Sequence, residues 1–213
     1  MSFLGWLGWL VSGTAAGYLA WILARLFTAK SVNPGVSNDT WVFISLLLFG
    51  LGLGIFLSCI TVSVPVGIGV LVVSVVLTAI SLVDFWSRRI PDILNLALLA
   101  WALMQITWQK QPTFASSGLG LLISGGLFFI LALVGRGAMG LGDVKLAAAL
   151  GALLGFPLVL IAVFIGVISG GLAAIGLVIA GRGKRGSTMA YGPYLALGGW
   201  VAIIGAAIGL WVH

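Results

Sequence analysis

The acidic side chains of this chain are few enough to be considered one at a time. The 213 residues include no glutamate and four aspartates, Asp39, Asp84, Asp92 and Asp143. Asp84 ends a hydrophobic segment in the stretch LVDFWSRRIPDILN, and Asp143 precedes another in the stretch GAMGLGDVKLAAALG. An ionisable side chain at the edge of a membrane segment is costly to place, which makes it a candidate functional residue.

Asp84 and Asp143, called the aspartate pair below, are the residues best suited to catalysis. Two carboxylates brought within a few ångströms cannot both ionise, so one keeps its proton while the other can activate water. Such a pair supplies the general acid and the general base that hydrolysis of an amide requires. The pair therefore predicts an aspartic peptidase. Two simpler interpretations stay open: Asp143 could only cap a helix, and Asp84 could pair with Arg88, four residues later.

The glycines before Asp143 favour a site that another chain can approach. Glycine removes side-chain bulk and permits a positive φ, so an extended substrate could lie close to the carboxylate; the glycines concerned are Gly137, Gly140 and Gly142. Asp143 is expected to cap the following helix and to lie near its positive end. Lys145 either balances the charge of the pair or anchors a cytoplasmic loop.

The remaining aspartates and the single cysteine predict no further chemistry. Asp92 follows Pro91 and opens a hydrophobic segment, which is typical of a helix N-cap. Asp39 is expected to be a solvated cap in the loop SVNPGVSNDT. Cys59 alone cannot form an internal disulfide or a cysteine-built zinc site. We therefore predict neither a metal nor another cofactor.

The composition shows which kind of element must position the pair. Hydrophobic residues make up 62% of the chain and charged residues 7%, whereas a soluble domain has about 25% charged residues. The chain is therefore predicted to be an all-α, polytopic membrane bundle. About eight spans of about 20 residues leave only about 50 residues for loops. We expect one membrane domain over 1–213, with N-terminal helices in 1–80 and a peptidase core in 81–213.

Hydropathy divides the chain into eight segments. They lie near Leu4–Phe27, Trp41–Val62, Val66–Val83, Ile93–Trp108, Ala115–Val134, Val144–Leu154, Pro157–Ala180 and Pro193–Trp211. The sixth is too short to span a membrane alone. It could run into its neighbour, begin inside the GAMGLG loop, or form a half-helix that lines a cavity.

The basic residues predict the orientation. Nine of the ten fall on one side of the alternating segments and Lys110 falls alone on the other, which places the first side in the cytoplasm. Both termini are then outside, all four aspartates lie at the cytoplasmic edge, and the sixth segment counts as a crossing. In a membrane chain the net charge of +6 indicates basic cytoplasmic loops rather than a nucleic-acid partner.

Glycines four residues apart indicate close helix packing. The pairs are Gly13/Gly17, Gly50/Gly54, Gly166/Gly170 and Gly205/Gly209. Small residues at this spacing let helix backbones approach each other. Packing inside one chain is favoured over a dimerisation face, and the oligomeric state is not predicted.

Three stretches of the chain, in order, resemble a known family. Asp84 is followed by Ile90 and Pro91; a glycine-x-glycine-aspartate motif, Gly140 to Asp143, is followed by Lys145; and Tyr191, Gly192 and Pro193 open the last segment. Together these stretches resemble the type IV prepilin peptidases, membrane aspartic peptidases related to archaeal preflagellin peptidases and, more distantly, to presenilins. The similarity runs roughly from Ile80 to the C-terminus. It implies that Asp84 and Asp143 are catalytic and that the other motif residues support the site, namely Pro91, Gly140, Gly142, Lys145, Gly192 and Pro193.

The resemblance also implies a substrate. Family members cleave prepilin or pseudopilin precursors, which serve type IV pili or type II secretion, at the cytoplasmic face of the inner membrane. Bifunctional members also methylate the new N-terminus and carry a cytoplasmic insertion with paired cysteines between the first two spans. Here that loop has thirteen residues, Thr28 to Thr40, and no cysteine. We therefore expect cleavage without methylation.

Other functions stay open at this stage. A presenilin-like intramembrane protease would carry tyrosine before the first aspartate and a later proline-alanine-leucine motif, whereas this chain has Val83 and Gly-Pro-Tyr. A transporter that relays protons through aspartates would place carboxylates near mid-membrane or on both sides. A non-catalytic assembly scaffold is a third alternative.

Overall fold

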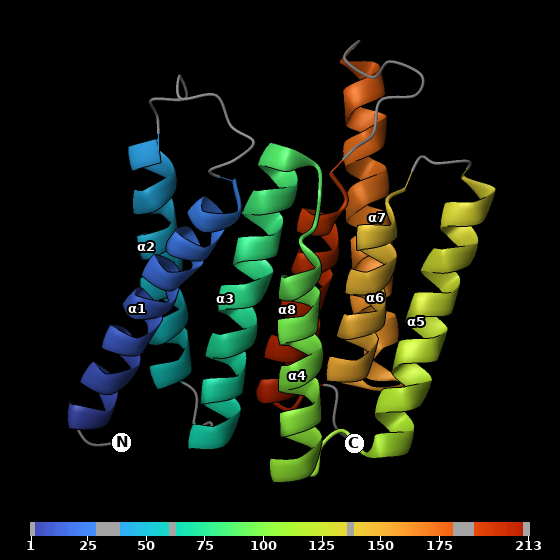
Figure 1. Ribbon diagram of the computed structural model, residues 1–213. Helices are drawn as coiled ribbons and strands as arrows, with labels where there is room; N and C mark the ends of the chain where they lie inside the picture. Colours follow the sequence, from blue (N-terminus) through green and yellow to red (C-terminus); the bar gives the residue numbers. More distant parts are fainter. Residues whose placement is uncertain (1–2, 29–38, 60–62, 136–138, 181–189, 211–213) are drawn as a thin grey trace.

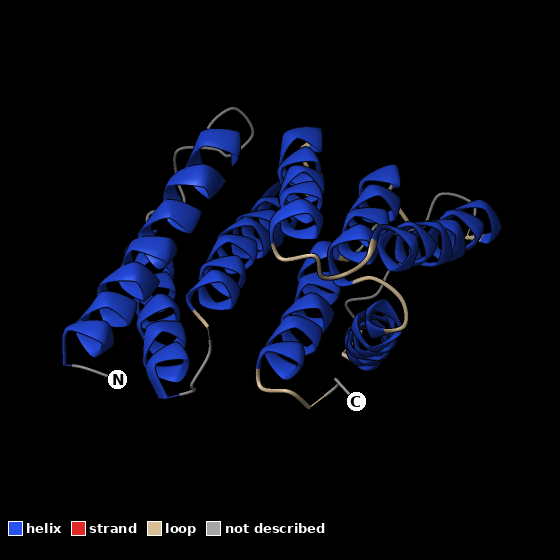
Figure 2. Ribbon diagram, turned by 90° about the horizontal axis from the view of Figure 1, so that it is seen from below, coloured by secondary structure: helices blue, strands red, loops and turns tan. Residues whose placement is uncertain are grey.

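The described residues form only α-helices and their connections. The computed structural model describes residues 3–28, 39–59, 63–135, 139–180 and 190–210. Within these ranges there are eight helices and no strand (Figure 2). They are α1 (Phe3–Thr28), α2 (Asp39–Cys59), α3 (Val64–Ser87), α4 (Asp92–Trp108), α5 (Phe114–Val134), α6 (Leu141–Leu154), α7 (Leu158–Ile179) and α8 (Gly192–Ala207). The predicted all-α class is confirmed.

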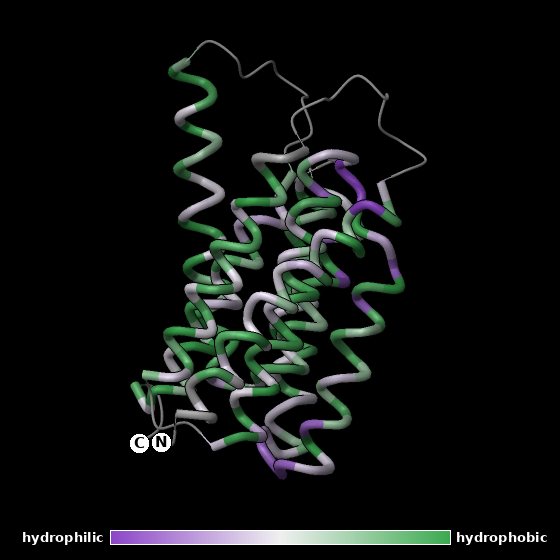
Figure 3. Tube along the Cα trace, turned by 90° about the vertical axis from the view of Figure 1, so that its left-hand side faces the viewer, coloured by the Kyte–Doolittle hydropathy of each residue, from purple (hydrophilic) through white to green (hydrophobic). Residues whose placement is uncertain are grey.

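Successive helices alternate in direction. α1, α3, α5 and α7 run upwards in Figure 1, and α2, α4, α6 and α8 run downwards. α1 begins and α8 ends at the lower end of the bundle in this view. Hydrophobic residues dominate the length of the helices, and hydrophilic residues gather towards their ends (Figure 3). The helix ends next to the nine basic residues therefore lie at one end of the bundle, as the alternation predicted.

Five of the described helices are long and apolar enough to cross a membrane: α1, α2, α3, α5 and α7. α4 and α8 are apolar but shorter. α6 has 14 residues, or about 21 Å at 1.5 Å per residue, less than the roughly 30 Å of a bilayer's hydrocarbon core. It begins inside the GAMGLG loop, which was one of the predicted alternatives, and nine of its residues are buried.

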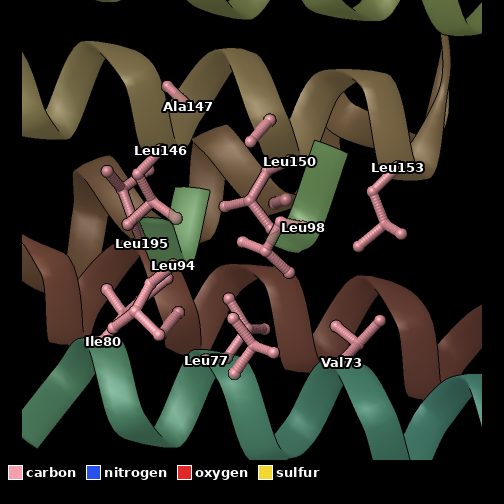
Figure 4. Packing of buried hydrophobic residues seen from close by; sticks show 14 of the residues in the cluster. Val73, Leu77, Ile80, Leu94, Leu98, Leu146, Ala147, Leu150, Leu153 and Leu195 are labelled. Carbon is pink, nitrogen blue, oxygen red and sulfur yellow. The ribbon is translucent and has the colours of Figure 1, made fainter. Parts of the chain in front are cut away.

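The core lies between α3, α4, α6 and α8. Its fully buried side chains are mostly leucines, which interdigitate across the four helices in Figure 4; they include Leu77, Ile80, Leu98, Leu146, Leu150 and Leu195. A bundle whose lipid-facing surface is also apolar depends on such close packing, because lipid tails are as apolar as leucine. This core holds together the helices that carry Asp84 and Asp143.

Glycines pack the first two helices backbone to backbone. A Cβ added to Gly13 would lie 2.8 Å from the backbone nitrogen of Gly54, and one added to Gly50 would lie 3.0 Å from that of Gly17. The expected packing within one chain is therefore confirmed for these pairs. Gly209 lies beyond α8 with a φ of 74°, so the proposed helical packing pair Gly205/Gly209 is wrong.

Candidate active site

Asp84 lies in the last turn of α3 and is buried. The helix stops where Arg88 adopts a left-handed conformation, with a φ of 51°, and its backbone N–H donates to the carbonyl oxygen of Asp84. The residue is 4% exposed, and its Oδ2 accepts a hydrogen bond of 2.8 Å from the N–H of Gly192 at the start of α8. The carboxylate forms no ion pair with Arg88, so that alternative interpretation is wrong for these two described residues.

Asp143 lies in the first turn of α6. Its Oδ2 accepts a hydrogen bond of 3.1 Å from the N–H of Gly140, the N-cap residue. Asp143 therefore helps to cap α6, but from the third helical position and not as the N-cap residue that the sequence suggested. Its other oxygen, Oδ1, is buried and has no hydrogen-bond partner in the structure. A buried polar atom without a partner is costly, so a cap alone does not account for Asp143.

The fold brings both carboxylates to one pocket. A cavity of about 300 Å³ is lined by the aspartate pair together with Arg88, Arg89, Ile90, Asp92, Gly140, Leu141 and Gly142. These residues come from the end of α3, the start of α4 and the start of α6. The pocket therefore lies at the end of the bundle where the sequence places the basic residues.

The electrostatics of the pocket favour a shared proton. Burial, and then the nearby negative charge of Asp84, raise the pKa of Asp143 from 3.8 to about 7, although the hydrogen bond from Gly140 opposes the shift. Near neutral pH, Asp143 is therefore able to hold a proton. A pair with one protonated and one ionised member can act as acid and base together.

Two of the glycines lie in close contact with neighbouring side chains. A Cβ on Gly192 would lie 2.8 Å from Oδ2 of Asp84, and a Cβ on Gly142 would lie 3.2 Å from that of Ile90. Gly140 has a φ of −78°, and Gly142 lies within α6, so neither uses the positive φ that glycine permits. Gly137 lies outside the described residues.

Lys145 binds Asp92 and not the aspartate pair. Its Nζ lies 2.7 Å from Oδ1 of Asp92, and both side chains are more than half exposed. The contact joins the first turns of α6 and α4. Asp92 is the first helical residue of α4 and Pro91 is the N-cap, so the predicted N-cap role of Asp92 is wrong by one residue. Asp39 begins α2, and its side chain lies outside the described part.

Tyr191 lies near the aspartate pair. The sequence placed it in the motif that opens the last segment but predicted no role for its side chain. It precedes Gly192, and its hydroxyl donates to the carbonyl oxygen of Gly166 in α7. Burial, and then the charge of Asp143, raise the pKa of Tyr191 to about 12. The sequence feature that could have singled out Tyr191 is its position directly before Gly192 and Pro193. Among the described residues, no group of three or more His, Cys, Asp or Glu side chains could hold a metal ion.

Comparisons with known proteins agree on a family. Residues 70–175 match the model of the type IV leader peptidase family. Three similar proteins are each named prepilin leader peptidase/N-methyltransferase. The one from Aeromonas hydrophila is 33% identical over 150 residues, which cover 66% of this chain and 51% of that protein. The one from Xanthomonas campestris pv. campestris is 33% identical over 62% of this chain and 47% of its own length.

The third, from Pseudomonas aeruginosa, is 29% identical over 63% of this chain and 48% of its own length. The chain thus spans about half the length of the curated relatives it matches. No solved structure matches it.

Proposed function

This chain belongs to the type IV leader peptidase family, and on that basis we propose that it is a membrane aspartic endopeptidase that removes the leader from type IV prepilin or pseudopilin precursors. The observation that carries the proposal is the meeting of Asp84 and Asp143 in one pocket. The unpartnered Oδ1 of Asp143 supports it, because a purely structural carboxylate at this depth would have its oxygens satisfied.

The geometry favours different roles for the two carboxylates. Each carboxylate accepts an N–H at the start of a helix, Asp84 from Gly192 and Asp143 from Gly140. Burial and the charge of Asp84 raise the pKa of Asp143 to about 7, so we assign Asp84 as the ionised base. Asp143 is the protonated acid. Asp84 takes a proton from water as the water oxygen attacks the scissile carbonyl carbon, and Asp143 donates its proton to the carbonyl oxygen. Collapse of the intermediate passes a proton to the departing amine nitrogen and leaves one proton on the pair.

The test is cleavage of a candidate prepilin by purified protein in vesicles. Asp84→Asn and Asp143→Asn should each lower the rate by about a thousandfold or more, since each removes one half of the acid–base pair. Asp92→Asn is the matched control, because it removes a carboxylate that lines the same pocket but is paired with Lys145. Near-normal cleavage by either variant of the pair would refute the mechanism.

We place the pocket at the cytoplasmic face of the inner membrane. Nine of the ten basic residues fall on the same side of the alternating hydrophobic segments as the pocket residues. By the positive-inside rule, that side faces the cytoplasm. A cysteine introduced at Gln111, in a Cys59→Ala background, should react with an impermeant reagent from the outside of intact cells. Labelling only after the cytoplasmic side is opened would reverse the orientation.

We further propose that this chain cleaves without N-methylation, although its relatives' names include N-methyltransferase. The support is the thirteen-residue stretch Thr28 to Thr40, which has no cysteine and is too short to bury a core of its own. Mass spectrometry of a substrate co-expressed with this chain, in a host without other prepilin peptidases, should find a free amine. A product heavier by one methyl group would contradict the proposal.

A further inference from the structure

Tyr191 contacts three helices and directly precedes Gly192, whose N–H donates to Asp84. We propose that it is a positioning residue that holds the start of α8, and with it the N–H of Gly192, against Asp84. The inference rests on the proposed peptidase function for its consequence in catalysis. The contacts that hold the start of α8 in place do not depend on that function.

The side chain of Tyr191 is fixed at both its ring and its hydroxyl. The hydroxyl donates a hydrogen bond of 3.2 Å to the carbonyl oxygen of Gly166 in α7. The ring centroid lies 6.0 Å from that of Phe128 in α5, which is fully buried, and 6.2 Å from that of Tyr194 in α8. Tyr191 therefore joins α5 and α7 to the residue at which α8 begins.

Gly170 leaves the space in which the tyrosine ring lies. A Cβ added to Gly170 would come 3.0 Å from Cζ and 3.1 Å from the hydroxyl oxygen of Tyr191. The ring therefore packs directly on the backbone of α7, one turn from its hydrogen-bond acceptor Gly166. Displacement of the ring at this point would also disturb the hydroxyl contact.

The backbone around Tyr191 leaves one donor for Asp84. The carbonyl oxygen of Tyr191 accepts the N–H groups of Tyr194 and Leu195, and Pro193 has no N–H to donate. The N–H of Gly192 is thus the first free donor of α8, and it lies 2.8 Å from Oδ2 of Asp84. Because Gly192 directly follows Tyr191, a shift of the tyrosine moves this donor.

The activity test compares two neighbouring glycines of α7. A Cβ on Gly170 would strike the tyrosine ring, whereas a Cβ on Gly171 would have nothing within 4 Å. Gly170→Ala and Tyr191→Ala should lower kcat for a candidate prepilin by about tenfold or more, because small misplacements of a catalytic group are costly, with KM within about twofold. Gly171→Ala should match the wild type, and Tyr191→Phe, which keeps the ring, should lose less than Tyr191→Ala.

A second measurement does not require a substrate. Spin labels at Phe85 and Leu197, both exposed side chains, report the separation of the end of α3 from α8 when introduced as cysteines in a Cys59→Ala background. Tyr191→Ala and Gly170→Ala should shift or broaden this distance distribution, and Gly171→Ala should not.

The two measurements separate the possible failures. Unchanged distances in both Tyr191→Ala and Gly170→Ala, or unchanged kcat despite altered distances, would overturn the positioning role. If the wild type cleaves no prepilin while the distances respond as expected, the proposed function fails and the structural role of Tyr191 stands.

Discussion

The contact between α1 and α2 and the pocket around Asp84 both depend on glycine, but the glycines face different partners. In the first contact, Gly13 and Gly50 lie against backbone atoms of the opposite helix. Beside the pocket, Gly192 lies against the carboxylate of Asp84. The same absence of a side chain serves packing in one region and access to a charged group in the other.

The two regions differ in the kind of side chain that they bury. The cluster that joins α1, α2 and α3 is built from apolar side chains such as Leu53, Leu57 and Val70. The pocket instead contains two buried carboxylates, one of which has an unpartnered oxygen. Burial of such groups costs free energy, which is typical of a site retained for function.

Among the glycine substitutions, the largest expected effect is on catalysis and comes from Gly192→Ala. The new Cβ would lie 2.8 Å from Oδ2 of Asp84, so the carboxylate or the start of α8 must move. We expect kcat to fall by about a hundredfold or more, with a small change in melting temperature. The measurement is prepilin cleavage alongside thermal unfolding of the same preparation. A loss of stability with full activity would mean that Gly192 only packs.

The converse effect is expected in the α1–α2 contact. Gly50→Ala would push a Cβ into the backbone of α1, whereas a Cβ on Gly52 would meet nothing within 4 Å. Overpacking costs about 1–3 kcal/mol, so the melting temperature should fall for Gly50→Ala and stay constant for Gly52→Ala. The kcat of both should remain within about twofold of the wild type. Equal stability of the two variants would contradict the packing.

A smaller effect, dependent on pH, distinguishes the pocket from the α1–α2 contact. The pKa of Asp143 is raised from 3.8 to about 7, so the folded state binds this proton more tightly than the unfolded state. Stability should therefore fall as pH rises from about 4 through about 7. Asp143→Asn should remove that fall, so its melting temperature should exceed the wild-type value by more at pH 8 than at pH 5.

The kcat of the wild type should also decline as pH rises above about 7, since Asp143 then loses the proton it donates. Parallel stability profiles for the wild type and Asp143→Asn would show that Asp143 does not titrate in this range. Gly50→Ala serves as the control, because its loss of stability comes from packing and should be the same at both pH values.

The smallest effect is expected at the exposed ion pair. Asp92→Asn and Lys145→Met should each change stability by less than about 1 kcal/mol and activity by less than about threefold, because exposed ion pairs contribute little. Prepilin cleavage at low and high salt would measure this. A large loss of kcat in Lys145→Met, with Asp92→Asn unaffected, would indicate that Lys145 balances the charge of the aspartate pair.

Several features of the site could be read from the chain alone. The scarcity of acidic residues isolated Asp84 and Asp143, and the ends of hydrophobic segments placed both at one end of the bundle. The partner of Lys145 could not be predicted, because Asp92 lies 53 residues away and two interpretations of an exposed lysine are equally consistent with its neighbours. The conformation of Gly140 could not be predicted either, since a glycine that permits a positive φ does not require one.

The sequence by itself determined that the chain is an all-α membrane bundle with two candidate carboxylates, because hydropathy and charge act locally and can be read segment by segment. Only the tertiary structure decided which backbone donor serves Asp84, since Gly192 lies 108 residues further along the chain. It also decided the contacts of Tyr191, whose ring and hydroxyl meet three helices. Such contacts depend on how the helices pack against one another, and no periodicity within a single segment encodes them.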